Sequence, residues 1–402
     1  MMAELKTMLG LRWVYGLVFM LFIGSPLFGQ NSSWLDSLKH KTSLNGYVKY
    51  MHTVILPGTD TTEMITDNFI HNRLNFEWNI SKHWTFNTSM RNRLFWGELV
   101  RLSNDAFTSL GDDPGFLDLS ILWTSGDSYA LHTIFDRMYF TYEKGRLNVI
   151  VGRHRINWGM TFIWNPNDIF NSYSFFDFDY EERPGTDAIQ INYYTSSTAQ
   201  LGLVYEFSDS LKGSSLAARY RFNAKNYDFQ FLGGYQRQNI VLGAGWAGDI
   251  RGAGFRGEGT YFISGADLEQ ENQFIGSMDI DYSFPRGLSL QLSYLFNSTG
   301  SNESAGDYTA FYLDRFLTVQ TLSPVMHNLF FQATGSVSPI VKLTLATMVN
   351  PADGSWFIGP TVDWSAFENF DILTTGQLFR GDPMTLFGDG GSFLFMRFKY
   401  SF

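Results

Sequence analysis

The sequence contains no cysteine among its 402 residues. This absence excludes a disulfide framework, thiolate catalysis, iron–sulfur ligation and a lipid anchor on cysteine. Proline is scarce, at 11 residues, and only 17% of the residues are charged, with a formal net charge of −10. An acidic chain with so few charges offers no broad basic surface, so we expect no nucleic-acid partner.

Long hydrophobic runs are also missing. The most pronounced one lies near the N-terminus, at residues 13–23, and is too short to cross a bilayer as a helix. It follows Lys6 and Arg12 and is ended by small residues and a proline, which is the pattern of an export signal. We therefore predict a signal peptide over residues 1–29 and a periplasmic lead-in over residues 30–42.

Aromatic residues, in contrast, are abundant and make up 17% of the sequence, as 38 Phe, 20 Tyr and 11 Trp. Many of them alternate with polar residues. Near the C-terminus the apolar members of one such row are Leu394, Met396, Phe398, Tyr400 and Phe402. Arg397 and Lys399 have the other parity. Side chains two residues apart on a strand share a face, so this stretch has an apolar face and a largely polar one.

The same alternation recurs in many stretches of residues 43–402, which we interpret as one domain. From it we predict about eighteen strands, with sixteen as the alternative. They lie near residues 43–55, 67–80, 83–101, 128–142, 147–158, 185–195, 198–208, 214–223, 226–237, 239–248, 252–264, 273–284, 287–297, 325–337, 340–350, 354–364, 369–380 and 391–402. Strands of this length suit a tilted crossing of a bilayer.

The connections between these strands are of two kinds. Tight links follow every second strand. The other connections include the long ones, at residues 56–66, 102–127, 159–184, 265–272, 298–324 and 381–390. Such asymmetry is typical of outer-membrane barrels. We therefore predict an all-β fold, a closed antiparallel transmembrane β-barrel with short periplasmic turns and long extracellular loops. Its last strand would pair with its first in the outer membrane of a Gram-negative bacterium.

Charged residues concentrate on the parity that would face the lumen. On the lipid face at mid-bilayer, an Arg or Lys would cost roughly 2–4 kcal/mol. We therefore predict that the pore is lined by Arg73, Glu77, Arg91, Arg93, Arg219, Arg221, Arg256, Glu258, Asp279 and Asp281. Two interpretations stay open: a salt-bridged lumen that fixes the barrel shape, and a mixed-charge eyelet that orients solutes and sets ion preference.

The segment from residue 151 to residue 185 is the most distinctive part of the chain. It contains the motifs Gly152-Arg153-His154-Arg155-Ile156-Asn157-Trp158-Gly159, Asn165-Pro166-Asn167-Asp168 and Arg183-Pro184-Gly185. With these motifs the chain resembles certain substrate-specific outer-membrane porins and related barrels. The resemblance implies that loop 159–184 narrows the pore, with Arg153, Arg155 and Asp168 near the constriction. Because Val151 and Arg153 have the same parity, we expect a bulge here, or a strand that leaves the membrane by Arg153.

The predicted function is passive diffusion of small polar or anionic solutes through an arginine-containing lumen narrowed by loop 159–184, without enzymatic activity. The histidines show no metal-ligand spacing and the acidic run at residues 177–182 shows no EF-hand spacing, so we predict no metal and no cofactor. The alternative is a non-conducting barrel that is a structural or docking component of an outer-membrane complex. An outer-membrane hydrolase would need a Ser–His pair at the rim.

The expected partners follow from the barrel. They are outer-membrane lipid, small solutes and the barrel-assembly machinery, which would bind the C-terminal strand that ends at Phe402. The sequence leaves open whether the chain forms a homo-oligomer or joins partners in an envelope complex.

Overall fold

The computed structural model describes residues 41–58, 64–113, 115–177, 179, 182–265, 270–303 and 317–402. The predicted signal peptide, residues 1–29, lies outside the described residues, and so does the predicted lead-in up to residue 40.

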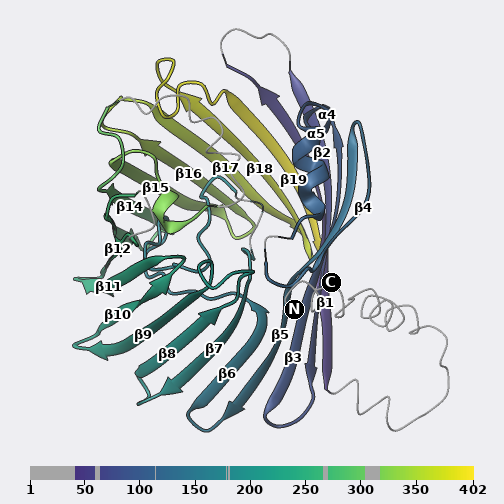
Figure 1. The fold of residues 1–402 in the computed structure, drawn as a ribbon. Helices are drawn as coiled ribbons and strands as arrows, with labels where there is room; N and C mark the ends of the chain where they lie inside the picture. The colour runs from purple at the N-terminus through teal and green to yellow at the C-terminus, as the bar shows by residue number, and fades with distance from the viewer. Residues whose placement is uncertain are drawn as a thin grey trace, which may run out of the picture.

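The regular secondary structure of the described chain is almost entirely β (Figure 1). Its elements are β1 (Thr42–Leu56), β2 (Ile65–Asn79), β3 (Trp84–Gly97), α4 (Glu98–Leu102), α5 (Asn104–Thr108), η1 (Ser109–Gly111), β4 (Ser120–Gly126), β5 (Tyr129–Lys144), β6 (Leu147–His154), β7 (Thr186–Tyr194), β8 (Ala199–Glu206), β9 (Ser215–Ala224), β10 (Tyr227–Gln236), β11 (Asn239–Ile250), β12 (Ala253–Ile263), β13 (Gln273–Ser283), β14 (Leu288–Asn297), η2 (Val319–Thr321), β15 (His327–Ser338), β16 (Val341–Val349), β17 (Trp356–Phe367), β18 (Phe370–Arg380) and β19 (Ser392–Ser401).

Eighteen of these strands form one closed antiparallel ring, which confirms the predicted fold class. The ring closes where β19 pairs with β1, from Tyr47 opposite Ser401 to Leu56 opposite Ser392. Two backbone hydrogen bonds of 2.9 Å, in both directions between Gly46 and Phe402, complete this seam. The predicted pairing of the last strand with the first is therefore confirmed, and the alternative of sixteen strands is wrong.

Strand β4 lies outside the ring and was not predicted. It pairs with residues 129–134 of β5, whereas β6 pairs with residues 138–144 of the same strand. It thus continues the wall above β6, and Figure 1 shows it rising beside β5. The preceding residues form α4, α5 and η1, within the stretch that we expected to be the end of a strand and a loop.

Two predicted strands were too long. The strand predicted at 83–101 ends at Gly97, where φ is +143° and the next residues begin α4. A Cβ at Gly97 would lie 2.6 Å from Oδ1 of Asp67, so the close approach of β2 also requires glycine. The strand predicted at 147–158 ends at His154, and the chain from Arg155 onward turns into the barrel.

The two faces of the wall differ as the alternation predicts. Outward side chains such as Ile70, Phe231 and Leu292 are exposed, at 36–55% of their full accessible surface. The largest cluster of buried apolar side chains lies inside the ring and joins loop residues such as Trp158 to wall residues such as Phe330. The core therefore lies between the inner wall and a loop that fills part of the lumen. No helix in the described part of the chain is long and apolar enough to span a membrane.

Candidate functional site: the lumen and its inward loop

The inward loop, residues 155–185, connects β6 to β7 and crosses the lumen. Residues 163–171 are all buried, although the stretch contains three asparagines, an aspartate and a proline. Buried polar groups need hydrogen-bond partners. The wall residues that form hydrogen bonds with the loop therefore trace its path.

The loop first contacts β9 and β10. Gln230 of β10 donates a 2.6 Å hydrogen bond from Nε2 to the carbonyl oxygen of Trp158. The guanidinium of Arg219, on β9, lies 5.2 Å from the centre of the Trp158 ring system. Trp158 is 1% exposed, and its ring meets that of Phe170 edge-on at 5.1 Å. These contacts fix the beginning of the loop against the wall.

Two carboxylates then hold loop backbone against β12 and β13. Glu258 accepts hydrogen bonds from the backbone N–H groups of Met160 and Asn167, the second at 3.2 Å. Asp279 accepts one from the N–H of Phe162 at 2.5 Å. Both carboxylates were predicted to line the pore. They face the lumen and bind the loop there.

Small residues in β11 allow the loop to lie close to this wall. A Cβ at Gly243 would lie 2.7 Å from Oδ1 of Asn167, and one at Gly245 would lie 3.0 Å from the Sδ of Met160. Asn167 donates from Nδ2 to the carbonyl of Ala244 at 3.0 Å. The two glycines of β11 thus leave the space in which the loop lies against the wall.

On the far side of the lumen the contacts are aromatic. Phe175 meets Phe330 of β15 edge-on, with the ring centres 5.0 Å apart, and Phe176 meets Phe357 of β17 in the same way at 5.1 Å. Gln377 of β18 donates from Nε2 to the carbonyl of Phe176 at 3.1 Å. The loop therefore reaches from one side of the barrel to the other.

The returning part of the loop is held by ion pairs at the seam. Asp179 lies 2.8 Å from Nζ of Lys49, on β1, and 3.6 Å from Arg397, on β19. Glu182 accepts a 2.8 Å hydrogen bond from the hydroxyl of Tyr47 and lies 3.7 Å from Arg73. These loop acids therefore balance cations of the wall.

The centre of the loop carries a cluster of positive charge around one buried carboxyl. Asp168 is 0% exposed and accepts the N–H of Trp158 at 3.1 Å. Burial raises the pKa of Asp168 to about 7, against the opposing effect of that N–H and of Arg155, Arg183 and Arg219. Burial and the neighbouring Arg155 lower the pKa of Arg183 to about 10. Three guanidinium groups thus act on a single carboxyl.

Arg155 and Arg219 each have a hydrogen-bond donor in this cluster that is not used. Within the described residues, the Nε of each is buried without a hydrogen-bond partner. The resemblance implied a constriction near Arg155 and Asp168, and the structure places both in the inward loop. Arg219, predicted from its parity on β9, faces them.

Most of the other predicted arginines face the lumen in contact with a partner. Nη1 of Arg73 lies 2.6 Å from Oδ2 of Asp136, and both side chains are almost fully buried. Nε of Arg91 donates to Nε2 of His71 at 3.2 Å.

The predicted lumen residues with more exposed side chains are also paired. Arg221 contacts Asp228 at 2.5 Å, and Arg256 contacts Asp281, so both pairs join neighbouring strands. Glu77, half-buried, accepts a 3.1 Å hydrogen bond from Nδ2 of Asn79 on its own strand.

Arg153 does not line the lumen, which corrects its expected position. In the register of β6 it follows the parity of Val151, which is 43% exposed on the outer face. Its guanidinium contacts Asp113 at 2.7 Å and Asp187 at 2.8 Å, and it donates to the carbonyl oxygen of Leu117 at 2.6 Å. The physical reason is that the strand ends close to this residue, so that Asp113 and Leu117 can bind a charge on the outward face. The strand ends one residue later, at His154.

A buried Ser–His contact occurs near the rim. Oγ of Ser120, on β4, lies 2.7 Å from Nε2 of His132, on β5, and also donates to the carbonyl of Leu110 at 2.8 Å. Nδ1 of His132 faces the guanidinium of Arg93 at 2.8 Å. Because a guanidinium only donates, the neutral imidazole carries its proton on Nε2 and cannot take one from Ser120. The contact therefore anchors β4 and does not form a nucleophile–base pair.

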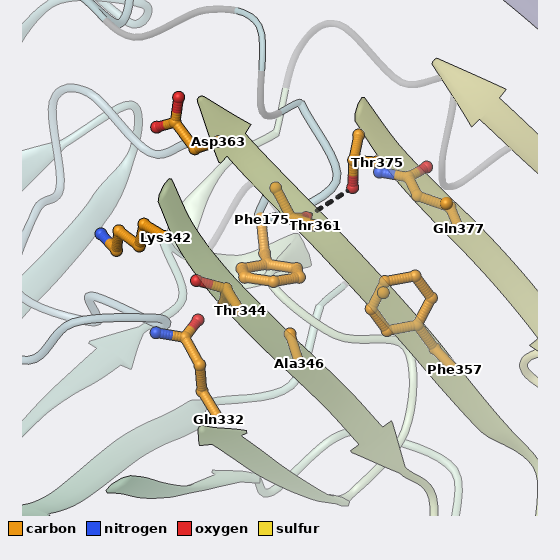
Figure 2. A pocket seen from close by; sticks show the side chains of 12 residues that line it. Phe175, Gln332, Lys342, Thr344, Ala346, Phe357, Thr361, Asp363, Thr375 and Gln377 are labelled. Carbon is orange, nitrogen blue, oxygen red and sulfur yellow. Dashed lines mark hydrogen bonds between the residues drawn. The ribbon is translucent and has the colours of Figure 1, made fainter. Parts of the chain in front are cut away.

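A cavity of about 240 Å³ lies beside the inner face of β15–β18, below Phe175. Figure 2 shows the side chains that line it. They are mainly hydroxyl, amide and phenyl groups, and the charged members are Lys342 and Asp363. Sequence patterns did not indicate this cavity, because Phe175 comes from a loop far along the chain from these strands.

Comparison with known proteins finds no match by sequence, since no family model and no curated protein matches the chain. Two solved structures have the same architecture. Acinetobacter baumannii OccAB3 is 11% identical, with a TM-score of 0.56 over 90% of this chain and 99% of that one. Pseudomonas aeruginosa OccK11 (OpdR) is 11% identical, with a TM-score of 0.54 over 90% and 96%. The chain has a porin-like fold. The resemblance to substrate-specific porins is thereby confirmed for the fold.

Proposed function

We propose that this porin-like chain is a passive channel of the bacterial outer membrane for small polar and anionic solutes. The observation that carries the proposal is the inward loop, which polar contacts hold from wall to wall inside the barrel, beside the cavity under Phe175. A barrel that only anchored other proteins would not need a loop fixed so closely inside it.

The charged lumen serves both of the purposes that we considered. Pairs such as Arg73 with Asp136 join strands and stabilise the shape of the wall. The cluster of Arg155, Arg183 and Arg219 has three positive charges to the one carboxyl of Asp168. Its excess charge attracts anions to the narrowed zone. Ion preference would therefore come from a few residues and not from the whole set of arginines.

Planar bilayer recordings test this function. The purified full chain should give discrete conductance steps, and a KCl gradient should give a reversal potential that favours chloride. Replacing Arg155 and Arg219 by glutamine should reduce that preference, whereas Arg146→Gln, an exposed turn residue, should leave it unchanged. A conducting channel whose reversal potential is the same in all three proteins would contradict the role of the cluster.

The second candidate is a non-conducting barrel that docks an envelope complex. It is favoured by the aromatic contacts of Phe175 and Phe176 with the far wall, which would also suit a permanent plug. Folded protein that inserts into bilayers and stays electrically silent would support this candidate and exclude the channel.

A further inference from the structure

The cavity under Phe175 differs in chemistry from the rest of the lumen. Strands β14–β17 contain no arginine, whereas β2, β3, β9 and β12 each place arginine on the inner face. The two charged residues at the cavity, Lys342 and Asp363, have opposite signs and are register partners on β16 and β17. The lining is therefore neutral overall.

Two hydroxyl groups of this wall, those of Thr361 and Thr375, use their protons on each other and on the backbone. Thr375 donates from Oγ1 to the carbonyl of Pro360 at 3.2 Å. Its Oγ1 lies 2.6 Å from that of Thr361, so Thr361 must donate in this contact, which Figure 2 marks. Gln377 donates an N–H to the carbonyl of Phe176. Lone pairs on Thr361 Oγ1 and on Gln377 Oε1 remain for a ligand.

The apolar part of the cavity complements these acceptors. The phenyl ring of Phe175 lies beside Thr344 and Ala346 of β16, and Phe357 stands on the neighbouring strand β17 (Figure 2). Ligand sites generally combine apolar surface with a few well-placed polar groups. The volume of about 240 Å³ suits a small solute rather than an oligomer.

We propose that this cavity binds a neutral polyhydroxylated solute of monosaccharide size, an inference that rests on the proposed channel function. The hydroxyl groups of such a solute donate to Thr361 and Gln377, and its C–H groups pack on Phe175. A carboxylate only accepts hydrogen bonds, so it would face lone pairs there. The inward loop thus gives the lumen two zones, one that attracts anions and one that binds neutral solutes.

Glucose and gluconate test the proposal because they share a carbon skeleton and differ in charge. With the full chain in planar bilayers, glucose should reduce the ion current in a saturable manner, and gluconate at equal concentration should show at least tenfold weaker saturation. The double variant Thr361→Val, Gln377→Leu should weaken the glucose effect at least tenfold. Thr141→Val, a threonine of β5 away from this wall, serves as the matched control.

Saturation-transfer NMR on the detergent-solubilised barrel separates this proposal from the channel function. Glucose binding that the double variant loses, in a protein without conductance, would support the cavity and overturn the channel. Conductance without any saturable glucose effect or NMR signal would overturn the cavity and leave the channel intact. Stronger binding of gluconate, or of a zwitterion such as glycine held by Lys342 and Asp363, would also overturn it.

Discussion

The carboxylate of Glu258 is the best place to test whether the inward loop sets the width of the lumen. It accepts two loop N–H groups, those of Met160 and Asn167. In Glu258→Gln the side chain keeps its size, but only one oxygen remains as an acceptor, and the new NH₂ group faces a backbone donor. Leaving a buried donor without its acceptor costs about 1–3 kcal/mol. Since 1.4 kcal/mol is a factor of ten, the released loop should become roughly ten- to a hundredfold more populated.

Single-channel recording measures this release. Glu258→Gln should show more frequent current transitions and a higher mean conductance than the unaltered protein. Asp279→Asn, which weakens the contact with one N–H group, should give a smaller effect of the same sign. Glu77→Gln removes a lumenal carboxylate that contacts Asn79 on its own strand and is the matched control. A folded Glu258→Gln barrel with unaltered current noise would refute the idea that this contact holds the loop.

Three further predictions concern the loop, the wall and the seam. Because the pKa of Asp168 is raised to about 7, it gains a proton as the pH falls from 8 to 6; anion preference in reversal-potential measurements and resistance to thermal unfolding should both rise, and both should change less with pH in Asp168→Asn. Arg73→Met takes the guanidinium away from the buried carboxylate of Asp136 and should lower the free energy of unfolding by about 3–5 kcal/mol, seen as an earlier loss of the compact band on heated gels. Adding Asp136→Leu should restore most of it, and an unaltered band in the single variant would contradict the pairing. Deleting Phe402 removes two hydrogen bonds to Gly46 and the expected contact with the assembly machinery, so the yield of folded barrel in cells should drop; an unchanged yield would contradict this.

The strands could be predicted because the preference of a side chain for lipid or for water depends on that residue alone. A side chain two positions along a strand meets the same environment, so a short window of sequence is enough to place Arg73 or Asp279 on the inner face. The expectation that failed, Arg153 near the constriction, came from the resemblance and not from this rule, since Arg153 shares the outward parity of Val151 and contacts Asp113 and Leu117 there. The rule itself missed β4, which pairs along part of one strand only.

The contacts of the loop could not be predicted, because they join residues far apart in the sequence. Gln377 reaches the carbonyl of Phe176 across 201 positions, and Glu258 reaches Met160 across 98. No periodicity relates such partners. The motifs of residues 151–185 indicated that the segment is special and that it enters the lumen, but not which wall it would meet. The contact of Lys49 with the loop was not predicted, because Lys49 is a single lysine on its strand and no sequence pattern connects it with Asp179.

Two parts of the loop are held by different interactions, hydrogen bonds on the β12 side and an ion pair at the seam. This difference determines which part of the loop can move. On the β12 side, Glu258 accepts backbone N–H groups, so release there needs only a shift of the chain and water to replace the bonds. At the seam, Lys49 is 0% exposed and pairs with Asp179, so separating them would break a buried ion pair. The inward loop should therefore begin to move at residues 158–167, with Asp179 as its pivot. Because Phe175 lies between these two regions, the same movement would enlarge the neutral cavity together with the charged zone.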